Sequence, residues 1–92
     1  MSQYFKCKWI HSHPEDPILL YSELDSSRME IRKIEIWSDN RIGYADQKEQ
    51  SNETELGLVA VPELSKIAKD PQFQPVEISK SEFEEVWAKR KS

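Results

Sequence analysis

The segment that begins at Ser79 constrains the fold most, because it carries a full set of helix signals. Ser79 and Glu82 have the spacing of a capping box, in which the serine caps the first turn and the glutamate reaches back to it. Phe83, Val86 and Trp87 follow at i, i+3 and i+4, which places them on one side of a helix. The sequence therefore predicts a C-terminal helix that buries an apolar stripe against another layer.

The other layer is predicted to be a β-sheet, because much of the earlier chain alternates with a period of two residues. Phe5, Cys7 and Trp9, for example, alternate with lysines. We expect strands over residues 4–10, 18–24, 29–37 and 41–45, with 56–61 as a short fifth strand and 73–78 as a further extended segment. The alternation changes phase at Arg32 and Lys33, which indicates a β-bulge or a strong twist.

The connecting segments contain residues that favour turns. Pro14 and Pro17 interrupt the chain after the first strand, and residues 38–40 favour a tight turn. Residues 47–55 are polar without periodicity, which predicts an exposed, mobile loop. Residues 62–68 predict a short helix that begins at Pro62 and places Leu64, Ile67 and Ala68 on one side. Strands first and helices last predict an α+β fold: an antiparallel sheet of four to five strands with a short helix and a C-terminal helix packed on one face.

The charge distribution argues against nucleic-acid binding. The chain has 13 Lys and Arg against 17 Asp and Glu, a formal net charge of -4. Binding a phosphate backbone requires a concentrated basic surface, whereas the basic residues here form only short clusters. An acidic chain suits a basic protein partner instead.

Expectations about compartment and membrane rest on one cysteine and on the lack of long apolar runs. Cys7 is the only cysteine, so no intramolecular disulfide can form. No apolar run approaches the roughly 20 residues that a membrane-spanning helix needs, and the N-terminal residues lack the apolar core of a signal peptide. We therefore expect a cytoplasmic protein that does not enter a membrane.

Both histidines lie in the short sequence WIHSHPED, residues 9–16. In a strand, His11 and His13 would point to the same side, where they could ligate zinc with Glu15 or Asp16 as a third ligand. Against this, Pro14 interrupts the strand, and all of the ligands would come from one turn. We therefore expect His11 to orient the turn, and a metal-binding protein or small enzyme that uses these residues is the alternative.

No catalytic motif is recognisable. A nucleophilic cysteine needs an open, electropositive setting, whereas alternation turns Lys6 and Lys8 away from Cys7. The glycines, Gly43 and Gly57, are isolated, so the chain has no glycine-rich phosphate loop. We predict a protein without catalytic residues and without a cofactor.

Candidate binding residues are an aromatic residue and two arginines. Trp37 falls on the side of its strand away from Ile34, and Arg41 lies across the following turn. The two could anchor a protein partner, since Trp and Arg dominate interface hot spots. In the alternative interpretation, a helix or loop covers Trp37 as a minor core. Arg32 could likewise join a basic binding surface or pair with acidic residues on neighbouring strands.

Several segments together resemble a family of small bacterial proteins that is known only as a domain of unknown function of about this length. They are KWIHS, PILLYSELD, RKIE and GYAD, followed by EISK with FEEVW (residues 8–12, 17–25, 32–35, 43–46, 77–80 and 83–87). Members often carry Asp-Gly at the hairpin turn, where this chain has Asp39 and Asn40. The likeness covers nearly the whole chain, so we expect residues 1–92 to form a single domain.

The resemblance supplies no activity, cofactor or site residue, so the functional hypothesis rests on size and charge. We predict a small, non-catalytic protein-interaction domain. Small acidic bacterial proteins of this kind sometimes neutralise a toxin, and an immunity-like role is therefore considered by analogy.

Overall fold

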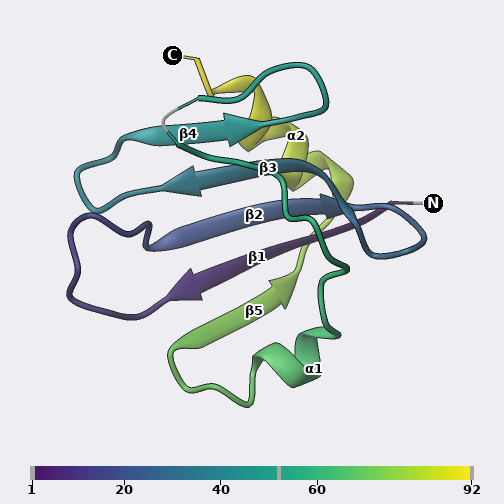
Figure 1. Ribbon diagram of the computed structural model, residues 1–92, viewed down its shortest axis with the longest axis horizontal. Coiled ribbons are helices and arrows are strands. Elements are labelled where there is room, and N and C mark those ends of the chain that lie inside the picture. The colour runs from purple at the N-terminus through teal and green to yellow at the C-terminus, as the bar shows by residue number, and fades with distance from the viewer. Residues whose placement is uncertain (1, 52, 92) are drawn as a thin grey trace.

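The computed structural model describes residues 2–51 and 53–91. Five strands form one antiparallel sheet in the order β4-β3-β2-β1-β5 (Figure 1). The predicted α+β class with an antiparallel sheet and two helices is confirmed. In chain order the elements are β1 (Gln3–Trp9), β2 (Leu19–Leu24), β3 (Glu30–Ile36), β4 (Ile42–Ala45), α1 (Leu64–Ile67), β5 (Phe73–Glu77) and α2 (Lys80–Ala88).

The sheet separates two hydrophobic clusters, one on each face. Alternation along β1 sends Phe5 and Cys7 to one face and Tyr4 to the other. The first face packs against α1, and the second packs against α2. In Figure 1, α2 lies behind the sheet, and the segment that leads into α1 crosses in front of it. The two helices therefore lie on opposite faces, whereas the sequence pattern suggested a shared one.

The capping serine of α2 acts as predicted, but the glutamate partner does not complete the box. The backbone N–H of Glu82 donates to Ser79 Oγ at 3.1 Å. The carboxylate of Glu82 pairs with Lys6 Nζ of β1 at 3.2 Å, which joins the helix to the sheet. Phe83 is completely buried, and Trp87 packs beside it in partial burial. The predicted apolar stripe is therefore confirmed.

The short helix α1 begins later than predicted. Its first residue is Leu64 rather than Pro62. Leu64 and Ile67 pack against the cluster around Phe5, as their spacing indicates. Ala68 lies exposed beyond the end of the helix.

The fifth strand is β5 rather than the predicted strand at residues 56–61. The backbone N–H of Ile78 donates to the carbonyl of Tyr4 at 3.0 Å. In an antiparallel pair, every second residue of a strand exchanges backbone hydrogen bonds with its neighbour. Counting back from Ile78, the nitrogen of Pro75 therefore faces away from β1, toward the open edge of the sheet. Proline fits at this position because the N–H that it lacks would have had no strand to pair with.

The irregularity in β3 occurs one position before the predicted step. Glu30 lies opposite Leu24, and Arg32 lies opposite Glu23. Ile31 is the extra residue between the two pairs, as in a β-bulge. The change of phase in the sequence thus reflects a real register shift.

The turn from β3 to β4 agrees with the prediction. Asn40 adopts a positive φ of 70°, in the left-handed region that asparagine tolerates. The backbone N–H of Arg41 donates to Asp39 Oδ1 at 3.1 Å. The side chain of Asp39 therefore stabilises the turn in which it lies.

Candidate functional site

His11 holds together the loop between β1 and β2. Its Nε2 is 2.8 Å from the carbonyl oxygen of Pro17, and its Nδ1 accepts a hydrogen bond from the backbone N–H of His13 at 2.9 Å. Its ring also lies edge-on to Trp9, with the ring centroids 4.6 Å apart. Both ring nitrogens are therefore used inside the protein, which fits the prediction that His11 orients the turn.

Of the other candidate metal ligands, His13 lies beside His11, with the two ring centroids 5.8 Å apart. His13 and Glu15 are exposed, and His13 Nδ1 lies 4.0 Å from Glu15 Oε1. The backbone N–H of Asp16 donates to the carbonyl of His13, as in a turn. Among the residues that the structure describes, no group of three or more His, Cys, Asp or Glu side chains is arranged to hold a metal ion.

Trp37 is buried, with 5% of its surface exposed. Its Nε1 donates to the backbone carbonyl of Glu15 at 3.0 Å, so the β1–β2 loop contacts one edge of the ring. The alternative interpretation, a covered minor core, describes its position. A binding role for Trp37 stays a prediction, and the buried ring gives it no support.

The two candidate arginines differ in their surroundings. Arg41 is exposed, pairs with Asp39 at 3.1 Å and lies 5.0 Å over the ring of Trp37. Arg32 is largely enclosed and joins Glu23 of β2 to Glu84 of α2. Arg32 therefore pairs with acidic residues of neighbouring elements, which was the second of its two interpretations. Of the two candidate arginines, Arg41 is the one exposed to solvent.

The ion pairs of Arg32 change the acidity of both carboxylates. Burial acts to raise the pKa of Glu23, but hydrogen bonds, chiefly from Arg32, outweigh it and lower the pKa. The hydrogen bond from Arg32 likewise lowers the pKa of Glu84. The guanidinium also lies 4.8 Å over the ring of Phe83. Arg32 thus joins α2 to the sheet at the border of the core.

Residues 54–62, here called the strap, cross the face of the sheet opposite α2 (Figure 1). Several hydrogen bonds attach the strap, among them one from the Val61 N–H to the carbonyl of Arg28 at 2.8 Å. Thr54 Oγ1 donates to Glu35 at 2.8 Å, the Gly57 N–H donates to Glu30 at 2.7 Å, and Arg28 Nε donates to the carbonyl of Val61 at 2.8 Å. Sequence patterns did not reveal these contacts, because they join residues far apart in the chain.

The start of the strap corrects the loop prediction. Thr54 belongs to the segment predicted to be exposed and mobile, yet it is completely buried. Residue 52 of that segment lies outside the described residues. Gly43 of β4 makes room for Thr54, since a Cβ there would lie 2.1 Å from Thr54 Oγ1. A small residue in β4 therefore determines how closely the strap can approach.

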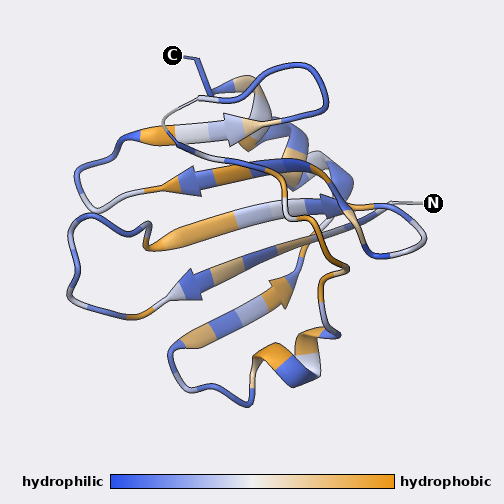
Figure 2. Cartoon of the chain, in the orientation of Figure 1, coloured by the Kyte–Doolittle hydropathy of each residue, from blue (hydrophilic) through white to orange (hydrophobic). Residues whose placement is uncertain are grey.

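The middle of the strap projects two large apolar side chains into solvent. Leu58 is 92% exposed and Val59 is 76% exposed. Figure 2 shows that the strap is largely hydrophobic, although it lies at the surface. Exposed apolar side chains that are adjacent in the chain are typical of interaction sites.

The family model described as Domain of unknown function (DUF6881) matches residues 3–92. The chain belongs to this family. Comparisons with curated proteins and with solved structures give no match. Within the described residues, no helix is long and apolar enough to cross a membrane. Family membership assigns no chemistry to this domain, so its function has to be judged from its surfaces.

Proposed function

We propose that this protein is a non-catalytic interaction domain that binds a basic protein partner through the strap. The observation that carries the proposal is the exposure of Leu58 and Val59. Burying an aliphatic side chain of this size stabilises a complex by about 1.5–3 kcal/mol. Two such side chains side by side can form the apolar centre of a small interface.

The attachment of the strap supports a binding role. The side chains of Glu30 and Arg28 bind the backbone on either side of Leu58 and Val59. Binding to a segment that is already held in place costs less conformational entropy than ordering a free loop. Leu58 and Val59 therefore lie on a backbone segment that hydrogen bonds already hold in place.

The charges around the strap favour a basic partner. Glu53, Glu55 and Glu63 are exposed near the apolar pair in the sequence, and Glu63 lies 3.7 Å from Arg28. The chain as a whole carries a formal net charge of -4. An apolar centre with a carboxylate rim would attract lysine and arginine side chains and raise the association rate.

The biological setting that we propose follows from size and charge. A small acidic domain that binds a basic protein could neutralise it, as an immunity protein neutralises a toxin. The buried thiol of Cys7 fits a reducing compartment, which we propose to be the cytoplasm. A gene for a basic toxin beside this one would make the pairing directly testable.

Affinity capture with matched variants tests the proposal. The purified protein is immobilised, and proteins are captured from a lysate of its native source at low and high salt. The double variant Leu58→Ser with Val59→Ser should lose the partner by at least tenfold, because two buried aliphatic groups contribute more than about 1.4 kcal/mol. Binding of the wild-type protein should also weaken as salt screens the carboxylates.

Val76→Ser is the matched control, because Val76 is a 51% exposed aliphatic residue on β5. This variant should keep the partner. A partner bound equally well by the double variant would overturn the proposed surface. Failure to capture a basic partner at any salt concentration would overturn the proposed function.

A further inference from the structure

On the opposite side of the sheet, α2 leaves part of the surface open. Strands about 4.8 Å apart make a sheet about 19 Å wide, and a helix about 10 Å across covers roughly half of that. The cluster under α2 includes Tyr4, Tyr21 and Ile34, and half-buried Leu19 packs at its border. At the open part of this face, Val76 is 51% exposed and Lys8 is exposed.

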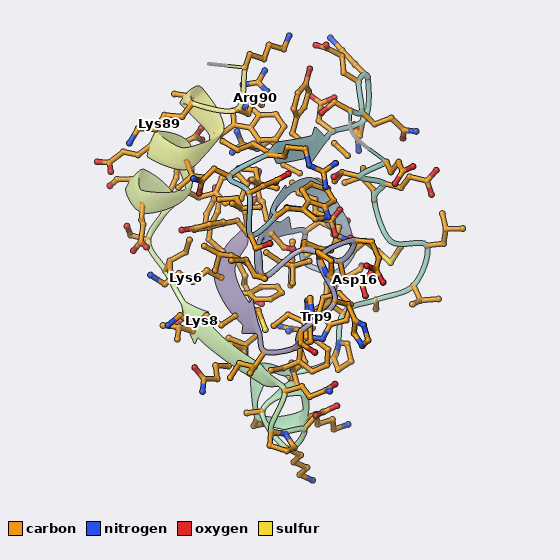
Figure 3. The ribbon with its side chains drawn as sticks, turned by 90° about the vertical axis from the view of Figure 1, so that its left-hand side faces the viewer. Lys6, Lys8, Trp9, Asp16, Lys89 and Arg90 are labelled. Atoms are coloured by element: carbon orange, nitrogen blue, oxygen red, sulfur yellow. The ribbon has the colours of Figure 1, made fainter. Side chains whose placement is uncertain are left out.

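A hollow of about 340 Å³ lies on this open part, here called the lysine hollow. Its residues come from three neighbouring strands and form two cross-strand rows. Lys8 lies between Leu19 of β2 and Gln74 of β5, and Lys6 lies between Tyr21 and Val76. Figure 3 shows Lys6 and Lys8 on the side of the sheet that carries α2. The volume falls in the range of small-molecule sites.

The lysine hollow combines an apolar floor with polar groups that lack protein partners. Leu19, Tyr21 and Val76 supply apolar surface. Across residues 2–51 and 53–91, the side chains of Lys8, Tyr21 and Gln74 have no hydrogen-bond or ion-pair partner. An ammonium, a phenol and an amide are all hydrogen-bond donors. A few converging donors above an apolar surface are typical of a ligand site.

We propose that the lysine hollow binds a small anionic amphiphile, a carboxylate attached to an apolar body. The ammonium of Lys8 pairs with the carboxylate, and the amide of Gln74 donates a hydrogen bond to it. The apolar body covers exposed Val76 and the accessible part of half-buried Leu19. This site lies on the opposite face of the sheet from the strap, so it is independent of the proposed protein interaction.

The two lysines of the hollow differ in whether they already pair with a carboxylate of the protein. Lys6 is already neutralised by Glu82 at 3.2 Å, so Lys8 supplies the uncompensated positive charge of the hollow. A cationic or neutral amphiphile would leave Lys8 without a counter-ion. The site should therefore discriminate between head groups of opposite charge on the same apolar chain.

The experiment is an NMR titration of the ¹⁵N-labelled protein with decanoate, kept below its micelle concentration. Decylammonium supplies the same chain with the opposite charge, and acetate supplies the head group without the chain. Decanoate should shift the backbone signals of Lys8, Leu19, Gln74 and Val76 in a saturable manner, and the other two probes should not.

Variants at Lys8 make the test specific. Lys8→Gln should weaken decanoate binding about fivefold, the equivalent of a surface ion pair worth about 1 kcal/mol. Lys8→Glu should reverse the preference toward decylammonium. Lys69→Gln, at an exposed lysine beyond α1, is the matched control and should leave binding unchanged. Because Lys8 and Lys69 are exposed, these variants should retain the wild-type fold, which their spectra check.

The following results would overturn the proposal. The first is the absence of saturable shifts with decanoate. The second is equal binding of decylammonium, or binding that Lys8→Gln leaves intact. The third is a set of shifts that tracks protein concentration, which would identify the open face as a contact between two copies of the chain.

Discussion

The two faces of the sheet are covered in different ways. On one face, α2 supplies its own backbone hydrogen bonds and contributes an apolar stripe around Phe83. On the other, the strap has no regular structure, so side chains of β3 and of the β2–β3 turn bind its backbone: Glu30 accepts from Gly57, and Arg28 donates to Val61. A helix can therefore be recognised locally, whereas the strap depends on distant partners that satisfy its polar groups.

The largest expected effect is on the helix side. Phe83→Ala removes a completely buried ring, and it should lower the free energy of unfolding by about 3–5 kcal/mol. Urea denaturation followed by circular dichroism measures the change. Val76→Ala, at a 51% exposed position, is the control and should cost far less. Similar losses for both variants would show that α2 does not close a core.

On the strap side, Gly43→Ala should lower the free energy of unfolding by about 1–3 kcal/mol, the usual cost of overpacking. The new methyl group would lie 2.1 Å from Thr54 Oγ1 and 3.0 Å from the ring of Trp37. Thr54 should move away, and Trp37 fluorescence should report a more exposed ring. The same substitution should cost less in a Thr54→Ala background. Equal costs in both backgrounds would argue that the strap does not depend on Gly43.

Glu30→Gln tests whether a buried carboxylate holds the strap. Glu30 accepts from Gly57 and from Ser22 Oγ, and it lies 3.4 Å from Lys33 Nζ. The neutral amide weakens these contacts, so we expect a loss of about 1–2 kcal/mol and faster hydrogen exchange at Gly57. Glu55→Gln, at an exposed position, is the control. Unchanged exchange at Gly57 would contradict the proposed anchor.

The helix side should also respond to acid through Arg32. Burial opposes the ionisation of Glu23, but hydrogen bonds, led by Arg32, lower its pKa below 4.5, and Arg32 lowers the pKa of Glu84 as well. Carboxylates with lowered pKa values stabilise the fold at pH values above 4.5, the ordinary pKa of a glutamate. This stabilisation is lost as the pH falls through their lower pKa values in the folded state. Urea unfolding across this range should show the loss. Arg32→Gln should flatten the dependence, and an unchanged slope would exclude these ion pairs as its source.

The smallest expected effect is that of zinc on His11. Both ring nitrogens of His11 already have partners within the β1–β2 loop. Added zinc should therefore leave the imidazole NMR signals of His11 unshifted and the melting temperature unchanged. Saturable shifts at His11 together with a higher melting temperature would revive the metal-site alternative.

Local patterns predicted the regular elements and missed the irregular ones. The serine cap and the stripe around Phe83 identified α2, and alternation identified β1 to β4, because each signal lies within a few neighbouring residues. The apolar run at residues 56–61 also satisfied the criteria for a strand. It became part of the strap because β5 pairs with β1 and because Glu30 captures the amide of Gly57.

The candidate site shows the same division. The role of His11 in its turn could be anticipated from the neighbouring prolines. The sequence left the burial of Trp37 as one of two interpretations, and contacts such as the one from its Nε1 to the carbonyl of Glu15 in another loop decided between them. The exposure of Leu58 and Val59 was hidden, since an apolar sequence by itself favours burial.

The sequence by itself determined an acidic α+β domain with a capped C-terminal helix and an antiparallel sheet, because periodicity and capping are local properties of the chain. Only the tertiary structure decided which face each helix covers, which segment became the fifth strand and which apolar residues stayed in solvent. Those outcomes depend on contacts between distant residues, such as Arg32 with Glu84 and Thr54 with Glu35. Such contacts leave no periodic signal in the chain, because each depends on a single pairing in space.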